Sequence, residues 1–161
     1  MSPPSLLHIV LVAPEIPWNT GNVGRTCLAV GAKLHLVQPL GFSLDERAVR
    51  RSGLDYWARV VPHLTVWPTW DSLEAQLPAL GAPFFFGPRV GRDYREPRYP
   101  DRTVLIFGCE SVGLPDALLA RRAAETVAIP MRDPDLRSLN LSTSVAVAAY
   151  EVCRQRDPRE P

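Results

Sequence analysis

Several familiar signals are missing from this chain. Its three cysteines, Cys27, Cys109 and Cys153, lie far apart and form no C-x-x-C or Cys/His cluster, so no metal site is expected. No segment approaches the ~18 consecutive apolar residues that a membrane span requires. The N-terminus has neither the basic segment nor the long apolar run of a signal peptide. These absences predict a protein without metal or membrane contact that works in a reducing, cytoplasmic setting.

Lysine is almost absent as well. Lys33 is the only lysine among 18 basic side chains, and 17 acidic side chains leave a net charge of +1. No global field therefore draws the protein towards nucleic acid, so any RNA site must be a local patch. The arginines suit forked recognition of phosphate, but codon bias is the simpler explanation, and composition leaves both open.

Motifs that identify common enzymes are missing too. No G-x-G-x-x-G follows the first strand, and neither G-x-x-x-x-G-K-[ST] nor G-x-S-x-G occurs. This argues against a dinucleotide site, a P-loop and a hydrolase nucleophile elbow. His8 and His35 lie inside strand patterns, and His63 lies in or beside one. These positions favour packed histidines over catalytic bases.

The chain does contain a regular alternation of strand and helix patterns over 161 residues, enough for one domain. Continuous apolar strands are expected within residues 6–14, 33–39, 59–68, 82–88, 102–108 and 125–131. Helices are expected at 19–31, 44–54, 69–80, 114–123 and from about 142 onward. The pattern predicts a single α/β domain, residues 1–161, with a mainly parallel sheet covered by helices on both faces.

Local polar residues predict how some of these elements begin and end. Asn19 or Thr20 is expected to cap the first helix, and Ser142 or Thr143 the last one. The charged tail from about residue 155 to residue 161 is expected to be disordered.

Three loops at strand ends are rich in Gly, Asn and Ser: "PEIPWNTGNVGR", "FGCESVGLP" and "IPMRDPDLRSLNLS". Their polar chemistry comes from Arg25, Glu110, Ser138, Asn140 and Ser142. Each residue alone has an ordinary explanation as a surface, helix-start or turn residue. Because ligands in such sheets bind outside the carboxyl ends of strands, their joint placement points to a ligand site.

The same loops resemble the three motifs of a known family. The segments "PEIPWNTGNVGRTCLAVGA", "LIFGCESVGLP" and "IPMRDPDLRSLNLSTSVAVAAYE" are similar to those of the SpoU (TrmH-type) branch of the SPOUT RNA 2′-O-methyltransferases. The likeness is strongest to the short TrmL-type enzymes, which act on cytidine or uridine 34, the wobble nucleotide of tRNA. Gly41–Phe42 and Arg50–Trp57 also match that subgroup, and the resemblance extends from Ile9 to Arg154.

The resemblance implies an α/β fold with a deep C-terminal trefoil knot, S-adenosylmethionine as cofactor, and a homodimer whose RNA site is built from both subunits. It assigns to Arg25 a catalytic role at the ribose 2′-hydroxyl. The cofactor site that it implies comprises Gly87, Gly108, Glu110, Gly113, Leu114, Ile129, Pro130, Met131, Ser138, Leu139 and Asn140. RNA contacts are implied at Asn19, Asn22, Arg25 and Arg137, with the anticodon stem-loop of tRNA as partner.

Two positions depart from the subgroup, because Cys109 and Val112 stand where proline and arginine are usual. This leaves the nucleotide target open. The alternatives are 2′-O-methylation of another tRNA or rRNA position, and a non-catalytic RNA-binding protein of the same fold. Because arginine is effectively always protonated, Arg25 is expected to orient the 2′-hydroxyl rather than to act as a base.

One further segment has a composition that suits RNA. Between residues 89 and 102, five arginines are interspersed with Tyr94 and Tyr99. The segment is either a surface for phosphate contact and base stacking or an ordinary solvated loop.

Overall fold

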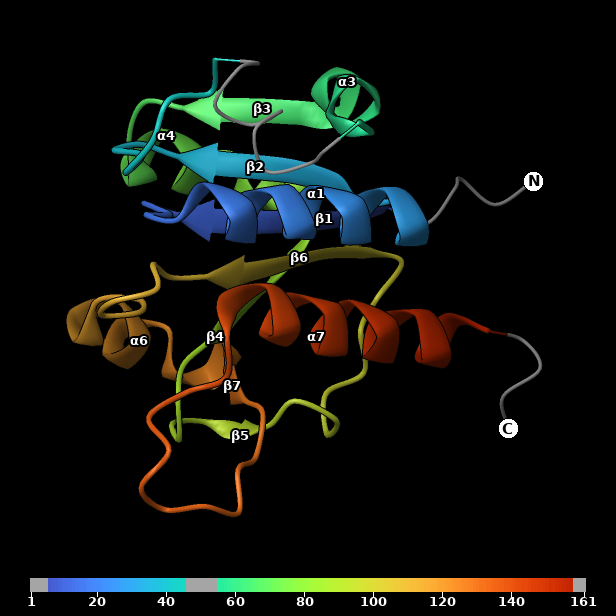
Figure 1. Ribbon diagram of the computed structural model, residues 1–161. Coiled ribbons are helices and arrows are strands. Elements are labelled where there is room, and N and C mark those ends of the chain that lie inside the picture. Colours follow the sequence, from blue (N-terminus) through green and yellow to red (C-terminus); the bar gives the residue numbers. More distant parts are fainter. Residues whose placement is uncertain (1–5, 46–54, 158–161) are drawn as a thin grey trace.

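A single seven-stranded sheet forms the centre of the computed structural model, which describes residues 6–45 and 55–157. Its strands are β1 (Leu6–Val12), β2 (Lys33–Val37), β3 (Leu64–Trp67), β4 (Ala82–Phe86), β5 (Arg92–Asp93), β6 (Arg102–Phe107) and β7 (Thr126–Ala128). They lie in the order β3-β2-β1-β6-β4-β7-β5, and every pairing is parallel. The predicted parallel α/β architecture is therefore confirmed, as Figure 1 shows.

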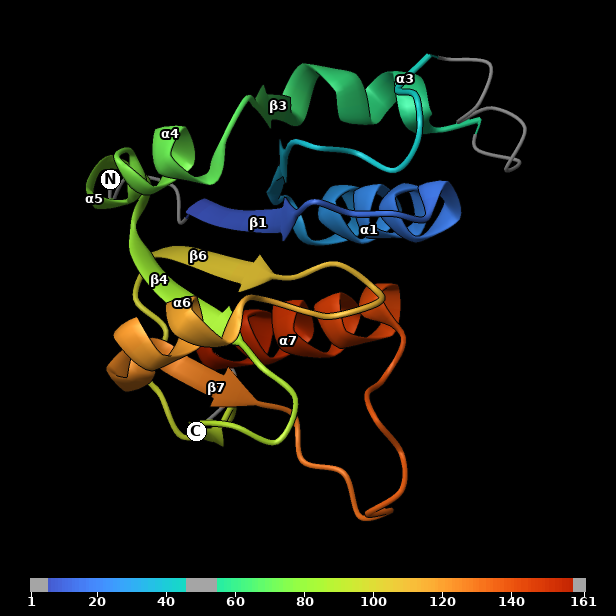
Figure 2. The ribbon, with the colours of Figure 1, turned by 90° about the vertical axis from the view of Figure 1, so that its left-hand side faces the viewer.

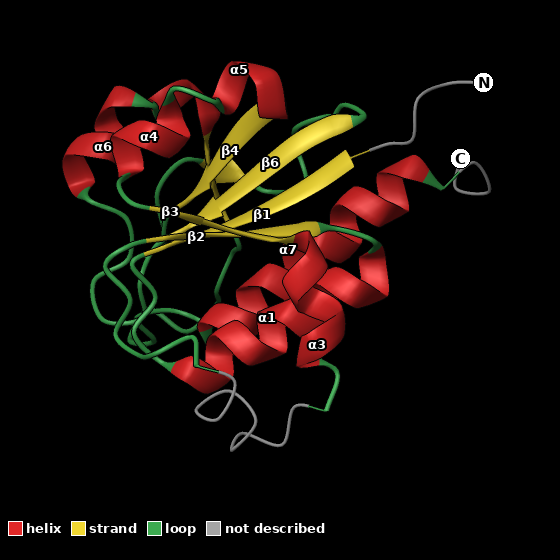
Figure 3. Ribbon diagram, turned by 90° about the horizontal axis from the view of Figure 1, so that it is seen from above, coloured by secondary structure: helices red, strands yellow, loops and turns green. Residues whose placement is uncertain are grey.

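Helices cover both faces of this sheet. They are α1 (Pro17–Val30), α3 (Trp57–Val60), α4 (Trp70–Glu74), α5 (Leu77–Leu80), α6 (Asp116–Arg121) and α7 (Leu141–Arg156), with 3-10 turns at Val61–His63 and Ala123–Glu125. Seen from above, α1, α3 and α7 lie on one face and α4, α5 and α6 on the other (Figure 3). The expected helix at 44–54 falls almost entirely outside the described residues.

Alternation along the central strands explains the two layers. Ile9 of β1 points towards α1, α3 and α7 and packs in a cluster with Val23 and Val145. Its neighbour Val10 packs on the opposite face with Leu73 and Leu118. Successive side chains of a strand point to opposite faces, so a strand buried on both sides is expected to be mainly apolar, and in β1 every residue except His8 is apolar.

The structure corrects the expected start of α1. This helix begins at Pro17, and its N-cap residue Ile16 has no side chain that accepts a hydrogen bond. The expected caps Asn19 and Thr20 lie inside the first turn, and they are 2% and 1% exposed. The acceptor for the helix start comes instead from a distant loop, as described below.

Three further differences concern the C-terminal half. Asn140, not Ser142 or Thr143, caps α7, since its side chain accepts hydrogen bonds from the backbone N–H groups of both. Helix α7 continues to Arg156, so residues 155 and 156 of the expected tail are helical, and residues 158–161 lie outside the described part. The segment after β4 also contains the short edge strand β5, which the sequence did not predict.

The proposed stacking surface in the segment from 89 to 102 is also corrected. Tyr99 is 4% exposed, and its ring packs 4.6 Å from that of Phe84. Tyr94 is half-buried against the same core. Neither ring is therefore free to stack on RNA bases, whereas the arginines around them remain exposed.

The parallel arrangement brings four loops to one edge of the sheet. The chain leaves β1, β4, β6 and β7 at their carboxyl ends, and in Figure 2 the arrowheads of β1 and β6 point to the same side. Ligand sites in such sheets form at this edge. Among the described helices, none combines the length and the apolar character of a membrane span.

Candidate active site

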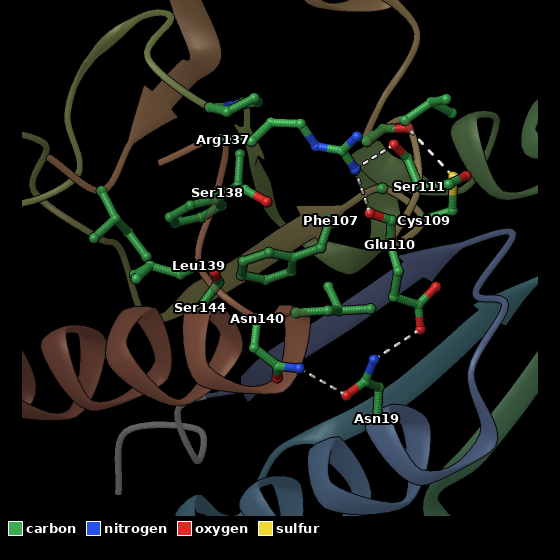
Figure 4. Close-up of a pocket in the computed structure, with 18 of the residues that line it drawn as sticks. Asn19, Phe107, Cys109, Glu110, Ser111, Arg137, Ser138, Leu139, Asn140 and Ser144 are labelled. Carbon is green, nitrogen blue, oxygen red and sulfur yellow. Dashed lines mark hydrogen bonds between the residues drawn. The ribbon is translucent and has the colours of Figure 1, made fainter. Parts of the chain in front are cut away.

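A cavity of about 570 Å³ opens at the carboxyl edge of the sheet. The loops that follow β4, β6 and β7 form its walls, and the first turn of α1 and the start of α7 close it (Figure 4). Its lining residues are Ile16, Asn19, Phe86, Gly87, Pro88, Phe107, Gly108, Cys109, Glu110, Ser111, Val112, Gly113, Ile129, Met131, Arg137, Ser138, Leu139, Asn140, Leu141 and Ser144.

The inner wall of the cavity is apolar. Phe86 and Phe107, the last residues of two adjacent strand elements, stack with ring centroids 4.5 Å apart. Ile129, Met131 and Leu139 add aliphatic surface from the loop between β7 and α7. Such a wall suits a planar ring or an aliphatic chain, with polar groups needed only at a few points.

The loop after β6 folds back tightly on itself. A Cβ atom on Gly108 would lie 2.0 Å from the backbone carbon of Gly113 and 2.1 Å from the nitrogen of Leu114. Gly113 itself has φ 68°, in the left-handed region that glycine tolerates. Glycine at position 108 is therefore required for the loop to present its backbone to the cavity.

The Glu110 carboxylate fastens this loop to α1. It accepts hydrogen bonds from the backbone N–H groups of Glu15 at 2.7 Å and Ile16 at 3.1 Å, and from the side-chain amide of Asn19 at 3.2 Å. A negative charge at this point also complements the positive end of the helix dipole. Glu110 thus supplies the cap that α1 lacks locally, and it lies beside the cavity with its carboxylate directed towards α1.

Asn19 and Asn140 extend the same network to α7. The Asn140 amide donates to Asn19 Oδ1 at 3.1 Å, while its Oδ1 atom accepts from the N–H groups of Ser142 and Thr143 at 2.9 and 3.3 Å. The chain Asn140–Asn19–Glu110 appears at the bottom of Figure 4. One asparagine therefore both caps α7 and holds it against α1.

Two further contacts join the loops above the cavity. Arg137 donates through Nη2 to the carbonyl oxygens of Ser111 at 2.5 Å and Glu110 at 3.2 Å. The Ser111 hydroxyl donates to a Glu15 carboxylate oxygen at 2.5 Å. That hydrogen bond is the main reason why the pKa of Glu15 lies below its usual range.

Most of the cofactor residues that the sequence resemblance implied lie at this cavity: Gly87, Gly108, Glu110, Gly113, Ile129, Met131, Ser138, Leu139 and Asn140. Two do not line it. Leu114 lies just before α6, is 3% exposed and packs in the core with Val10. Pro130 is exposed.

The implied RNA residues divide in a similar way. Asn22 and Arg137 are exposed, but Asn19 is 2% exposed and its amide oxygen and nitrogen are engaged with Asn140 and Glu110. Asn19 is therefore a structural member of the network, and its polar atoms are engaged within the protein in this structure.

Arg25 lies away from the cavity in the described chain. It lies in a separate surface hollow with Leu28, Ala29, Asp55, Tyr56 and Arg59. Its guanidinium carbon is 5.6 Å from the centroid of the Tyr56 ring, a cation–π distance, and the Tyr56 hydroxyl donates to the carbonyl oxygen of Gly21 at 3.0 Å. Arg25 is thus exposed, but its orientation is supported by an aromatic ring.

The histidines are remote from the cavity. His8 Nδ1 and His35 Nε2 lie 2.8 Å apart in the core, and Trp67 Nε1 donates to His35 Nδ1 at 3.0 Å. Burial is the main cause that lowers the pKa of both rings to about 4. Packed histidines are thus confirmed at positions 8 and 35. Among the described residues, no three His, Cys, Asp or Glu side chains gather as a metal site would require.

Sequence reasoning missed the aromatic wall. In the sequence, Phe86 and Phe107 fall inside strand patterns, although both stand at carboxyl ends of strands, where the sheet geometry predicts ligand contact. Pro88 and Ser144 also line the cavity without a pattern in the sequence that distinguishes them.

Known proteins with similar sequences and structures share this architecture. A Burkholderia cenocepacia protein named tRNA (cytidine(34)-2′-O)-methyltransferase is 45% identical over 152 residues, which cover 93% of this chain and 96% of that protein. A solved structure described as giving insights into the 2-OH methylation of C/U34 on tRNA is 44% identical, with a TM-score of 0.88 over 98% of this chain and 100% of that one.

A more distant structure carries a ligand. The SpoU methyltransferase AviRb from Streptomyces viridochromogenes, in complex with the cofactor AdoMet, is 27% identical with a TM-score of 0.74, covering 96% of this chain and 62% of that one. Finally, the sequence model of the SpoU rRNA Methylase family matches residues 6–150, nearly the whole chain, and this protein therefore belongs to the SpoU methylase family.

Proposed function

We propose that this protein is an S-adenosylmethionine-dependent RNA 2′-O-methyltransferase that methylates the wobble nucleotide, cytidine or uridine 34, of tRNA. The observation that carries the proposal is the cavity at the carboxyl edge, built from the loops after β4, β6 and β7. The relative that bears this activity in its name aligns with almost the full length of the chain.

The cavity fits S-adenosylmethionine in size and in chemistry. Its volume of about 570 Å³ is within the ~300–1,000 Å³ typical of small-molecule sites. Phe86, Phe107 and Leu139 offer apolar contact to the adenine ring, and the backbone around Gly108 and Ile129 offers hydrogen bonds. When bound, the cofactor supplies a methyl group already activated by a sulfonium, so the protein mainly has to hold and align the reactants.

Arg25 has a positioning role at the ribose in this proposal. Its guanidinium stays protonated, so it donates hydrogen bonds to the 2′-hydroxyl and the adjacent phosphate rather than removing a proton. The phosphate or water accepts the proton. Because a lysine lacks the planar fork, Arg25→Lys should lower kcat at least about tenfold. Near-wild-type turnover of this variant would contradict the role.

A homodimer would explain how Arg25 can act although it lies outside the cavity of its own chain. Trp18 and Tyr150 are 58% and 57% exposed and lie on α1 and α7, two helices that pack against each other. Large exposed aromatics on adjacent helices favour a protein contact. We propose that a second copy covers this face and that the partner subunit's Arg25 serves the cavity.

Mixed dimers test this arrangement. One parent would carry Arg25→Ala and the other a blocked cavity, Leu139→Trp. A mixed dimer then has one site with an intact cavity and an intact arginine from its partner, so activity should appear that neither parent has. Failure to regain activity, in a mixture shown by sedimentation to exchange subunits, would mean that Arg25 works within its own chain.

Other features of the family are also proposed for this chain. The return of α7 from the loop after β7 to pack against α1 and β6 is compatible with the trefoil knot of the family. Residues 1–161 are proposed to act as a single domain, and a tRNA substrate implies work in the cytoplasm.

The RNA side of the proposal rests on exposed polar groups. Asn22 and Arg137 are exposed, Arg137 lines the cavity, and both are proposed to contact the anticodon stem-loop. Val112, which stands where the subgroup usually has arginine, is 81% exposed. With valine at this position, the cavity mouth lacks one potential contact to an RNA phosphate. The position of the methylated nucleotide therefore has to be tested directly.

Nucleoside mass spectrometry on tRNA from cells with and without the gene is the decisive experiment. Loss of 2′-O-methylation at nucleotide 34 is expected in the deletion strain, and purified protein with S-adenosylmethionine should restore it. An unchanged position 34 with loss at another tRNA or rRNA site would shift the target. No calorimetric binding of S-adenosylmethionine would favour a non-catalytic RNA-binding protein.

A further inference from the structure

The loop between β7 and α7 forms one wall of the cavity, but it has little support of its own. Residues 129–140 contain neither helix nor strand, and residues 132–138 are all exposed. The loop nevertheless contributes Ile129, Met131 and Leu139 to the cavity. A segment with so few buried contacts opens easily unless specific hydrogen bonds hold it.

Arg89 provides such hydrogen bonds from the turn after β4. Its Nη2 group donates to the carbonyl oxygens of Asp133 and of Leu136, the latter at 2.7 Å. Both acceptors lie in the middle of the exposed stretch. A guanidinium that donates to carbonyls makes charge-assisted hydrogen bonds, which are stronger than those between neutral groups.

The backbone at Arg89 supports a specific role for this side chain. Its φ of 55° lies in the left-handed region, which non-glycine residues seldom occupy. This conformation follows directly after Gly87 and Pro88, both of which line the cavity. The turn therefore lines the cavity with Gly87 and Pro88. Its next residue, Arg89, contacts the loop between β7 and α7, which forms another wall of the cavity.

Arg137 fastens the same loop near its other end. It donates to the carbonyl oxygens of Glu110 and Ser111, so the exposed stretch is tied to the loop after β4 by Arg89 and to the loop after β6 by Arg137. Arg137 lines the cavity, whereas Arg89 does not. Any effect of Arg89 on a bound molecule must therefore pass through the loop.

We propose that Arg89 is a positioning residue for the cofactor, which pre-orders the wall formed by residues 129–140. The inference rests on the proposed function, because it takes S-adenosylmethionine as the occupant of the cavity. Binding to a pre-ordered wall avoids the entropy cost of ordering the loop on association. The composition of residues 89–102 leaves open whether Arg89 contacts RNA phosphate, whereas in the structure its guanidinium donates to protein carbonyls.

The test compares Arg89→Met and Arg89→Lys with the control Arg98→Met, which removes an exposed arginine from the same region. Calorimetric titration with S-adenosylmethionine should give a Kd about tenfold higher for Arg89→Met, since two charge-assisted hydrogen bonds are lost. The lysine variant keeps a cation that reaches one of the two carbonyl oxygens. Its increase in log Kd over the wild type should therefore be about half of that of Arg89→Met. The control should bind as the wild type does.

Hydrogen exchange and kinetics separate positioning from general support. In Arg89→Met, the amides of residues 130–138 should exchange faster, while those of β1 and β6 keep their protection. At saturating S-adenosylmethionine, kcat should stay within about twofold of the wild type, because only the KM for the cofactor carries the cost of ordering.

Three results would overturn the inference. Equal cofactor affinity of Arg89→Met and wild type would exclude any positioning effect. A raised KM for tRNA with unchanged cofactor affinity would make Arg89 a phosphate contact, and faster exchange throughout the sheet would make it a general stability residue. If the wild type itself binds no S-adenosylmethionine, the proposed function fails, and the exchange of residues 130–138 still reports whether Arg89 orders the loop.

Discussion

Replacing Glu110 with glutamine tests whether a residue of the cavity loop holds the start of α1. The carboxylate accepts three hydrogen bonds, from the backbone of Glu15 and Ile16 and from the Asn19 amide. Glutamine has the same shape but a single acceptor oxygen. Its NH2 group would face a backbone N–H group, so at least one donor of the helix start would lose its partner.

The magnitude follows from these contacts. A hydrogen bond to a charged group contributes about 1.5–3 kcal/mol, and the interaction of the charge with the helix dipole about 0.3–1 kcal/mol. Because Glu110 is only half-buried, solvent screening reduces both contributions, and a total loss of about 2–3 kcal/mol is expected. For a domain of this size, 1 kcal/mol shifts Tm by about 2–4 °C, so Glu110→Gln should melt about 5–10 °C below the wild type.

Thermal melting followed by circular dichroism measures the change, with Glu96→Gln as the matched control at an exposed position. The control should melt within about 1 °C of the wild type. A Glu110→Gln protein that melts with the control would refute the reasoning, because the N–H groups of Glu15 and Ile16 before α1 would then find equally good acceptors in water.

Three other perturbations follow from the structure. Gly108→Ala should abolish calorimetric binding of S-adenosylmethionine, because the new Cβ would lie 2.0 Å from backbone across the loop; retained binding would contradict the tight turn. Asn140→Asp keeps the cap of α7 but loses the amide donor to α1, so in urea titration it should lose less stability than Asn140→Ala, which costs about 1–2 kcal/mol from the cap alone. With the pKa of His8 and His35 lowered by burial to about 4, the unfolded chain takes up protons below pH ~6.5 and the folded chain does not. The free energy of unfolding should therefore fall from pH 6.5 to 4 by up to ~1.4 kcal/mol per pH unit for each ring. His8→Gln should flatten this slope in urea titrations, and an unchanged slope would contradict the role of the buried rings.

The architecture of the sheet was predictable because each strand carries its own signal. A strand buried on both faces is mainly apolar, and this holds for β1, β2 and β6, although His8, His35 and Thr103 are buried polar residues within them. The short edge strand β5 lacks that signal, because its two residues, Arg92 and Asp93, are polar and partly solvated.

The start of α1 was mispredicted for a different physical reason. Helix-capping preferences predict that the N-cap is a polar residue close to the helix start, and Asn19 and Thr20 have suitable side chains. The actual acceptor is Glu110, which lies 95 residues from Glu15 along the chain. No local pattern encodes such a contact, so Asn19 could be identified as part of a site but not as the buried link between two helices.

The cavity was predicted in outline because its glycines and small polar residues fall at strand ends. Its aromatic wall was not, since Phe86 and Phe107 differ in no local respect from other strand residues. The position of Arg25 outside the cavity also depends on tertiary structure, because it follows from the way α1 packs beside α3.

The order of the strands has a consequence for how the chain is made. β1 emerges first from the ribosome, but in the sheet it lies between β2 and β6, and β6 begins only at Arg102. At a synthesis rate of about 5–20 residues per second, the apolar edge of β1 that faces β6 stays unpaired for several seconds. During that time the nascent chain presents a continuous hydrophobic strand edge of the kind that recruits other strands. The protection of this edge is therefore a task for chaperones or for the ribosome surface rather than for the finished fold.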